Sequence, residues 1–274
     1  MKKTKIKKDF YFSNNSEVKF ILGPCQIESL DHSLMIAEKI SKICFELNAK
    51  FIFKSSFDKA NRSSIRAKRG VGLEEGLKIL QEVSNNFGCP VLTDVHEASQ
   101  CKILAEVVDI IQIPAFLSRQ TDLLLAAGET QKPVNIKKGQ FLSPKDMIKV
   151  AEKVSSTGNE NIFLCERGTS FGYDNLVVDM LGISKLKTFN CPIIFDVTHS
   201  LQLPGQGKTA AGGRGDQAED LAKAGVSLGI AGLFIEVHPD PKEALCDGPS
   251  ATPLDQFETL LTKVNAVDQA VKGF

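Results

Sequence analysis

The feature that most constrains the fold is a series of eight short apolar segments, each rich in Ile, Val and Phe. They span residues 18–24, 50–57, 89–97, 109–116, 132–139, 161–168, 191–199 and 232–239. Largely continuous apolar runs of this length suit strands that are buried on both faces, as in a parallel sheet. Segments with a helical spacing of apolar residues lie between most of them, in the ranges 29–49, 72–88, 143–158, 216–229 and 253–271.

This alternation of strands and helices favours an α/β fold, a closed (β/α)8 TIM barrel. We expect one domain over residues 1–274, because barrels routinely exceed about 200 residues as single units. An open, doubly wound sheet is the alternative, although no G-x-G-x-x-G motif follows the first strand. We expect the first 17 residues to close the bottom of the barrel as a short N-terminal hairpin, with a disordered tail as the alternative.

Charge and cysteine content indicate which partners and which cell compartment to expect for this chain. The 33 basic and 33 acidic side chains balance, which gives no reason to expect a nucleic acid or a membrane as partner. No apolar stretch approaches the roughly 20 residues that cross a bilayer, and the N-terminus does not resemble a signal peptide. The seven scattered cysteines, without a C-x-x-C motif, indicate reduced thiols and a cytoplasmic protein.

One glycine-rich stretch, residues 204–216, contains the letters GKT of a phosphate-binding loop. That motif needs a glycine five residues before Gly207, where this chain has Gln202. We therefore reject a nucleotide-binding loop and expect a mobile loop after the seventh strand.

Polar side chains follow every predicted strand, at the barrel end where catalytic groups belong. Charged groups on buried strands are costly unless they are paired or functional, so we expect a ring of them around one mouth. One subset is basic, and suits phosphate or carboxylate groups: Lys54, Lys59, Arg62, Lys137, Lys138 and Arg167. The alternative is that these cations form salt bridges with Asp94, Asp196 and Glu166.

A second subset contains one thiol, one imidazole and two carboxylates: Cys25, His199, Glu236 and Asp247. Such a mixed set is typical of a site for a divalent transition metal ion. The alternative is that Cys25 is a buried structural thiol, which is the commoner role of a single cysteine.

Several motifs resemble those of the 3-deoxy-D-manno-octulosonate 8-phosphate (KDO8P) synthase family of Gram-negative lipopolysaccharide biosynthesis. The longest are FKSSFDKANRSS at 53–64 and FGYDNLVVD at 171–179, and the others, such as GPCQIES, TDVHE and FDVTHSLQLPG, follow in family order. The resemblance covers residues from about 20 to 255. It implies a (β/α)8 barrel, a homotetramer, and condensation of phosphoenolpyruvate with arabinose 5-phosphate and water to give KDO8P and phosphate.

The resemblance also implies roles for individual residues. Lys59, Lys138 and Arg167 would hold phosphoenolpyruvate, with Lys54 and Gln112 nearby, and either Lys137 or Lys138 would make the direct contact. Asn61, Arg62 and Ser63 would hold the sugar phosphate, Arg62 reaching in from a neighbouring subunit. Asp94 and His96 would lie along the sugar, and Phe116 would form an apolar wall. The expected catalytic groups are Lys138, His199, Asp247 and Cys25.

In this family a cysteine at the position of Cys25 marks the metal-dependent class, and an asparagine marks the class that works without metal. The resemblance thus implies a divalent ion (Zn, Fe, Mn or similar) on Cys25, His199, Glu236 and Asp247, where it orients the aldehyde or activates water. The segment CDGPSA at 246–251 resembles metal-independent members, so a dispensable metal remains an alternative, and Cys246 is a competing ligand.

Three other functions stay open at this stage. A related 3-deoxy-arabino-heptulosonate 7-phosphate (DAHP) synthase would use erythrose 4-phosphate, although that group more often shows a Lys-Pro-Arg-Thr segment in place of KANRSS. A Schiff-base aldolase would use Lys138 as its nucleophile. A barrel without activity would serve as a binding scaffold.

Overall fold

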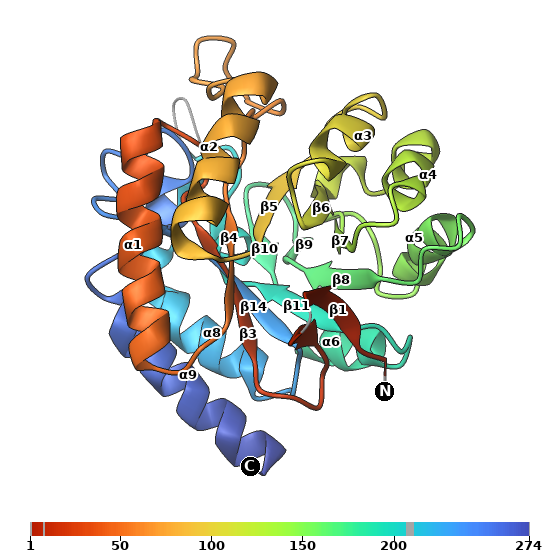
Figure 1. The fold of residues 1–274 in the computed structure, drawn as a ribbon. Helices are drawn as coiled ribbons and strands as arrows, with labels where there is room; N and C mark the ends of the chain where they lie inside the picture. Colours follow the sequence, from red (N-terminus) through yellow and green to blue (C-terminus); the bar gives the residue numbers. More distant parts are fainter. Residues whose placement is uncertain (1, 8, 207–210, 274) are drawn as a thin grey trace.

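The computed structural model describes residues 2–7, 9–206 and 211–273 and shows a closed parallel barrel (Figure 1). The strands of the barrel, in chain order, are β3 (Lys19–Gly23), β4 (Phe51–Lys54), β5 (Val91–Asp94), β6 (Ile110–Ile113), β7 (Val134–Lys137), β8 (Ile162–Glu166), β11 (Ile193–Asp196) and β14 (Gly232–His238). Each pairs in parallel with the next, and β14 returns to β3, which closes the barrel. The predicted (β/α)8 fold is confirmed, and the open-sheet alternative is wrong.

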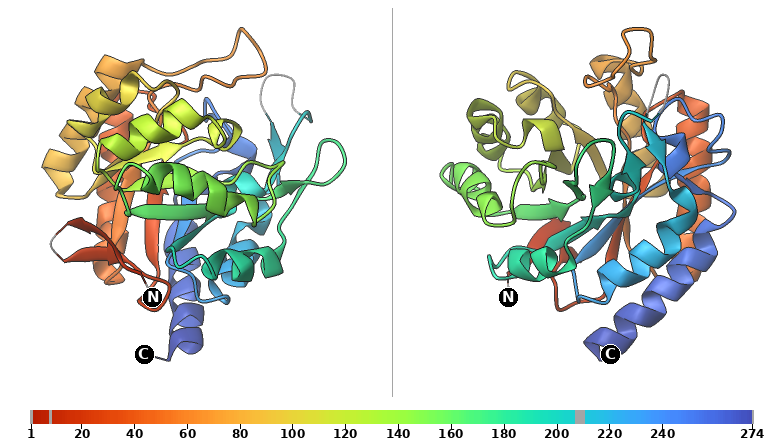
Figure 2. Two further views of the ribbon diagram at one scale, coloured as in Figure 1. Left: turned by 90° about the vertical axis from the view of Figure 1, so that its right-hand side faces the viewer. Right: turned by 180° about the vertical axis from the view of Figure 1, so that it is seen from behind.

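Helices surround the barrel on its outside (Figures 1 and 2). They are α1 (Leu30–Glu46), α2 (Leu73–Phe87), α3 (Gln100–Ala105), α4 (Thr121–Glu129), α5 (Asp146–Ser155), α6 (Met180–Lys187), α8 (Ala218–Val226) and α9 (Phe257–Lys272). The sequence analysis located α1, α2, α5, α8 and α9, but named no helix for α3, α4 or α6. Those three have only 6, 9 and 8 residues, too few to show a clear helical repeat. Among the described residues, no helix combines the length and apolar character needed to cross a membrane.

Short elements decorate the carboxyl end of the barrel. The strands β9 (Thr169–Ser170) and β10 (Leu176–Val177) form a hairpin after β8, and the helical turn α7 (Val197–Ser200) follows β11 directly. The strands β12 (Gln202–Leu203) and β13 (Gly212–Gly213) pair in antiparallel fashion, while β15 (Thr252–Pro253) extends the sheet beside β14. The 3-10 turns are η1 (Ala115–Leu117), η2 (Gly215–Gln217) and η3 (Gly248–Ser250).

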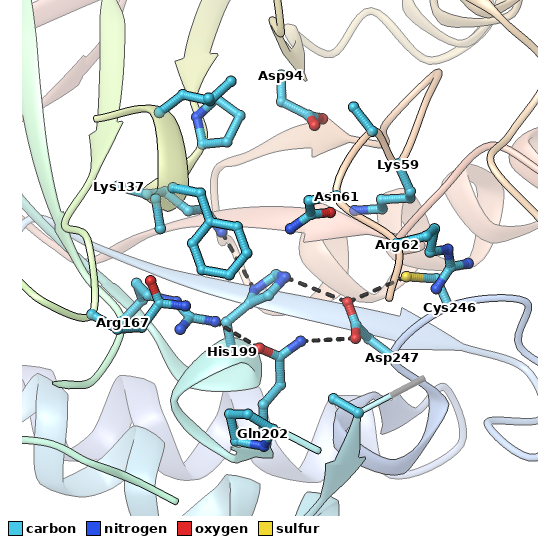
Figure 3. Close-up of a pocket in the computed structure, with 18 of the residues that line it drawn as sticks. Lys59, Asn61, Arg62, Asp94, Lys137, Arg167, His199, Gln202, Cys246 and Asp247 are labelled. Carbon is cyan, nitrogen blue, oxygen red and sulfur yellow. Dashed lines mark hydrogen bonds and ion pairs between the residues drawn. The ribbon is translucent and has the colours of Figure 1, made fainter. Parts of the chain in front are cut away.

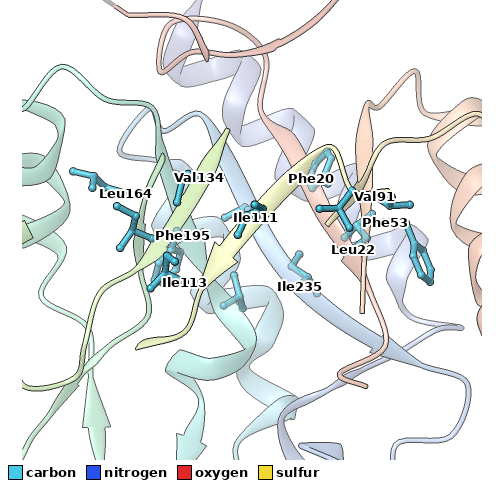
Figure 4. Close-up of a cluster of buried hydrophobic side chains, with 14 of the residues drawn as sticks. Phe20, Leu22, Phe53, Val91, Ile111, Ile113, Val134, Leu164, Phe195 and Ile235 are labelled. Atoms are coloured by element: carbon cyan, nitrogen blue, oxygen red, sulfur yellow. The ribbon is translucent and has the colours of Figure 1, made fainter. Parts of the chain in front are cut away.

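The strands are buried on both faces, which explains why their sequences are continuously apolar. Outward-facing side chains such as Phe20, Ile111 and Phe195 pack against the helices (Figure 4). Alternate residues point inward and fill the barrel with a second cluster that includes Ile21 and Phe163. The barrel is therefore a packed core, and any ligand site must lie at its mouth.

The N-terminal hairpin closes the other end, as expected. The strands β1 (Thr4–Lys7) and β2 (Phe10–Phe12) pair in antiparallel fashion. Phe12 is fully buried and its ring meets that of Phe163 edge to face, with 5.1 Å between centroids. A Cβ atom at Gly232 would lie 2.8 Å from the Phe12 ring, so glycine makes room for this contact.

Phe12→Ala is expected to lower the free energy of unfolding by about 3–5 kcal/mol, because it leaves a cavity inside the barrel. Tyr11→Ala is the matched control, since Tyr11 is only half-buried on the same strand and should cost about 1 kcal/mol or less. Urea unfolding of both variants measures the difference. Equal losses in the free energy of unfolding would contradict the prediction that Phe12 stabilises the barrel by filling its closed end.

Candidate active site

A cavity of about 330 Å³ lies at the carboxyl end of the barrel strands. It is lined by many of the side chains that the sequence analysis proposed: Lys54, Lys59, Asn61, Arg62, Ser63, Asp94, His96, Gln112, Phe116, Lys137, Arg167, His199 and Asp247. Residues from widely separated segments thus converge on one site, of a volume suited to small metabolites.

Cationic side chains occupy two sides of this pocket. In Figure 3, Lys137 and Arg167 lie on one side, while Lys59 and Arg62 lie on the other. Arg167 is buried, and its Nη1 has no hydrogen-bond partner within the described part of the chain. A buried, unpaired guanidinium nitrogen at a pocket wall is suited to an anionic ligand.

The short turn α7 fixes His199. Asp196 caps this turn by accepting a hydrogen bond of 3.0 Å from the His199 backbone N–H, and its carboxylate also lies 2.8 Å from His199 Nδ1. Lys137 pairs with the same carboxylate. Burial alone would raise the pKa of Asp196, but His199 and Lys137 overcome it and lower that pKa. Because Asp196 contacts Nδ1, the Nε2 atom of His199 is directed toward Glu236 and Asp247.

The four expected metal ligands fall into two neighbouring groups that share Asp247. His199 Nε2 is 3.7 Å from Glu236 Oε1 and 3.7 Å from Asp247 Oδ2. The Cys25 thiol donates to Asp247 Oδ2 over 3.1 Å, and the Cys246 thiol approaches the same oxygen at 3.4 Å. Asp247 is therefore shared by two groups that can hold a metal ion, one with Cys25 and Cys246 and one with His199 and Glu236.

The chemistry of these donors fits a divalent transition metal. Glu236 is almost completely buried; its Oε1 accepts a hydrogen bond of 2.9 Å from Lys54, but its Oε2 has no partner among the residues described. An unsatisfied buried carboxylate oxygen beside an imidazole and a second carboxylate is what a bound cation would complete. The Asp196 contact to His199 Nδ1 is the outer support that metal-bound histidines usually have.

The buried ionisable groups of the site shift one another's pKa values. Burial opposes ionisation of Lys59, yet Cys25 and Cys246, followed by the carboxylates of Glu236 and Asp94, raise its pKa well above the ordinary value. Burial is also the main cause that raises the pKa of Cys25, so metal binding there would release a proton. Lys59 thus carries a positive charge that offsets the carboxylates below it.

One expectation about cations needs correction. Lys138 is not among the residues that line the pocket: its Nζ faces the Leu142 carbonyl, Thr169 Oγ1 at 2.9 Å and Glu166 Oε1 at 3.4 Å. Successive residues of a strand point to opposite faces, so Lys137 turns into the barrel mouth and Lys138 turns away. Lys137 replaces Lys138 as the candidate contact, and this placement also removes the basis for a Schiff base on Lys138.

Arg62 lines the pocket of its own chain, and its expected approach from a neighbouring subunit stays a prediction. Its Nη2 donates to Gln26 Oε1 over 3.0 Å and its Nε donates to the Lys68 carbonyl over 2.9 Å. These contacts hold the loop after β4 over the pocket.

Gln202 is a site residue to which the sequence analysis gave no role. Its Oε1 accepts from Arg167 Nη2 over 2.7 Å, and its Nε2 donates to Asp247 Oδ1 over 2.8 Å. It links the anion-binding side of the pocket to the metal-ligand group. Its place in the motif FDVTHSLQLPG was the available signal. Residues 207–210 of the predicted mobile loop lie outside the described residues, so their mobility remains a prediction.

Comparisons with known proteins identify the family of this chain. The profile of the DAHP synthetase I family matches residues 3–273. A protein of Syntrophotalea carbinolica named 2-dehydro-3-deoxyphosphooctonate aldolase is 52% identical over 265 residues, covering 97% of this chain and 96% of the relative. Proteins of the same name from Shewanella amazonensis (52% identity, 97% and 94% covered) and Actinobacillus pleuropneumoniae (54%, 90% and 87%) are similar. That name denotes KDO8P synthase, so the predicted resemblance is confirmed, and the chain belongs to the DAHP synthetase I family.

Proposed function

We propose that this chain is an enzyme that condenses phosphoenolpyruvate with arabinose 5-phosphate and water to give KDO8P and inorganic phosphate, a step of lipopolysaccharide biosynthesis. The observation that carries the proposal is the pocket itself. It places two groups of cations on opposite sides of one cavity, with His199 and Asp247 between them (Figure 3). Two phosphorylated substrates need two such anion sites.

Phosphoenolpyruvate is assigned to the side formed by Lys137 and Arg167, with Lys59 reaching it from the opposite wall. Its carboxylate and phosphate together match the charge of these three groups. Lys54 and Gln112 complete this end. The fixed orientation of Gln112, which accepts from Asn135 Nδ2 over 2.9 Å, supports a positioning role.

Arabinose 5-phosphate is assigned to Asn61, Arg62 and Ser63 at its phosphate. Its hydroxyl groups are assigned to Asp94 and His96, which contact each other at 3.0 Å. Asp94 Oδ1 and His96 Nδ1 have no other partner among described residues, so each is free to bind a sugar hydroxyl. Phe116 forms an apolar wall at the mouth.

In the reaction, carbon 3 of phosphoenolpyruvate forms a bond to the aldehyde carbon, and the aldehyde oxygen takes a proton. Water adds at carbon 2 and loses one proton, which leaves a hydroxyl group there. This hydroxyl then loses its proton as it becomes the ketone, the bond from carbon 2 to the phosphate oxygen breaks, and the departing phosphate takes the proton. Arg167 and Lys137 balance the charge of phosphoenolpyruvate throughout. The Asp247 carboxylate lines the pocket and accepts hydrogen bonds from Gln202 and Cys25, which fix its orientation there.

A divalent metal ion is part of the proposal, with Cys25, His199, Glu236 and Asp247 as its ligands. When bound, it supplies Lewis acidity toward the aldehyde oxygen or the water. Glu236 Oε2, which has no hydrogen-bond partner in the part of the chain that the structure describes, supports this assignment. Cys246 is the alternative thiol, because it meets the same Asp247 oxygen.

The assembly and location are also proposals. The seven cysteines are free and buried, which supports a reducing, cytoplasmic setting. Large exposed aromatic side chains follow three adjacent strands at one end of the barrel: Phe116, Phe141, Phe171 and Tyr173. An apolar surface of this kind supports contact with further copies of the chain, in line with a homotetramer.

Phosphate release tests the function directly. We expect release from phosphoenolpyruvate when arabinose 5-phosphate is present, and at least about a 100-fold lower kcat/KM with erythrose 4-phosphate, since the shorter sugar leaves polar groups of the site unpaired. Phosphoenolpyruvate without any sugar is the control for simple phosphatase activity. A preference for erythrose 4-phosphate would indicate DAHP synthesis instead, and sugar binding without phosphate release would indicate a scaffold.

A further inference from the structure

A second group of metal-ligating side chains lies outside the pocket. It consists of Glu28, His32 and His238, one ligand atom of each lying within 4.8 Å of the others. Glu28 lies just before α1, His32 lies in its first turn, and His238 is the last residue of β14. None of the three lines the pocket or belongs to the Cys25 group. The substrates and the proposed catalytic metal leave this group without a role.

His238 is fixed in the orientation of a metal ligand. It is only 6% exposed, and its Nδ1 lies 2.6 Å from the backbone carbonyl of Asp240. The Asp240 backbone N–H also approaches Nδ1, at 3.2 Å, so Asp240 fixes the ring through Nδ1 and leaves Nε2 as the ring nitrogen that faces Glu28. That Nε2 lies 3.4 Å from Glu28 Oε1 and makes no hydrogen bond within the described chain.

His32 approaches from the other side. Both of its ring nitrogens are buried and lack a hydrogen-bond partner among the residues described. Its ring centroid is 4.9 Å from that of His238. Ser29, the N-cap of α1, accepts from the His32 backbone N–H over 3.1 Å and so fixes this turn. Burial lowers the pKa of His32, which favours the neutral imidazole that metals bind.

We propose that Glu28, His32 and His238 form a second metal site that takes a divalent ion of the zinc type. Two imidazole nitrogens and one carboxylate, with water as the fourth ligand, are a familiar zinc set. Glu28 Oε1 also accepts from the Leu245 backbone N–H over 3.2 Å, at the segment that leads to Cys246 and Asp247. An ion here joins the start of α1 to β14 beside the loop that carries catalytic groups.

Metal stoichiometry tests the proposal without reference to catalysis. Chelator-stripped full-length protein is titrated with Zn²⁺ by calorimetry, and bound zinc is counted after dialysis. We expect two equivalents for the unmodified chain, one for His32→Leu and one for Cys25→Asn. Asp31→Asn is the matched control, since it removes a charge from the same exposed turn without removing a ligand, and it should keep two equivalents.

The variants distinguish the two sites, because His32→Leu should lose the ion of the second site and Cys25→Asn should lose the ion of the catalytic site. Loss of a direct ligand should weaken the second site by more than the roughly 10- to 100-fold typical of an outer partner. Thermal unfolding with Zn²⁺ adds a second readout: the zinc-induced rise in Tm should shrink in His32→Leu while the Tm of the stripped variant shows that it folds. If His32→Leu and His32→Gln both bind as much zinc as the unmodified chain, the proposal is overturned, whatever happens at Cys25.

Discussion

Removal of divalent metal from the purified enzyme is expected to lower the rate of phosphate release by about 10²- to 10³-fold. A Lewis acid contributes several kcal/mol to a transition state, and each 1.4 kcal/mol corresponds to about a tenfold change in rate. Glu236 Oε2 has no hydrogen-bond partner among the described residues, and one oxygen each of Glu236 and Asp247 lies 3.7 Å from His199 Nε2. The assay compares stripped protein, verified as metal-free by elemental analysis, with the same sample after addition of Zn²⁺, Fe²⁺ or Mn²⁺.

Thiol variants identify the ligand. Cys25→Ser should bind the catalytic ion more weakly and lose activity, whereas Cys246→Ser makes the same chemical change against the same Asp247 oxygen and should retain both. Cys25→Asn places the residue of the metal-independent class at this position, and activity without metal in this variant would support a hybrid site. Undiminished turnover of verified metal-free, unmodified protein would refute the metal assignment and leave the condensation reaction standing.

His32→Leu serves as a further control in this experiment. Because stripping removes ions from both proposed sites, a loss of activity on its own does not say which ion matters. The variant lacks a ligand of the second site only, so we expect its restored activity to depend on one equivalent of metal at Cys25.

Lys137→Met is expected to reduce kcat/KM for phosphoenolpyruvate by about 10²- to 10³-fold. Removing one member of a buried charge pair costs about 2–5 kcal/mol, and here it removes a cation from the pocket wall as well. Lys137 Nζ pairs with Asp196 and lies 3.4 Å from His199 Nδ1, so its loss also disturbs the support of His199. Steady-state kinetics with each substrate varied in turn should show the larger defect with phosphoenolpyruvate.

Lys138→Met is the matched control, because it makes the same change one residue later. Its ammonium lies among backbone carbonyls, Thr169 and Glu166, so we expect reduced stability with little change in kcat/KM per folded molecule. Arg167→Met provides an independent check, since it removes a pocket cation without touching the Asp196 pair. Equal loss of turnover in Lys137→Met and Lys138→Met, with both variants folded, would contradict the assignment of Lys137.

Much of the fold followed from local pattern. Eight continuous apolar segments specified strands buried on both faces, and their spacing left room for only a parallel, helix-covered sheet. The polar residue types at the strand ends were also visible, because a Lys, His or Glu at the end of a buried strand is costly unless it is paired or binds a ligand. Short helices such as α3 were not predicted, because six residues do not display a helical repeat.

Lys137 and Lys138 show what could not be predicted from the sequence alone. Lys137 and Lys138 are chemically identical, and only the pleat of β7, set by its pairing with β6 and β8, turns the first toward Asp196 and the second toward Glu166. Residue type and order thus determined the barrel, its family and the chemistry gathered at its mouth. Tertiary structure alone decided which side chain faces which, and brought His238 beside Glu28 and His32, because contacts between distant segments depend on the register and twist of the closed sheet.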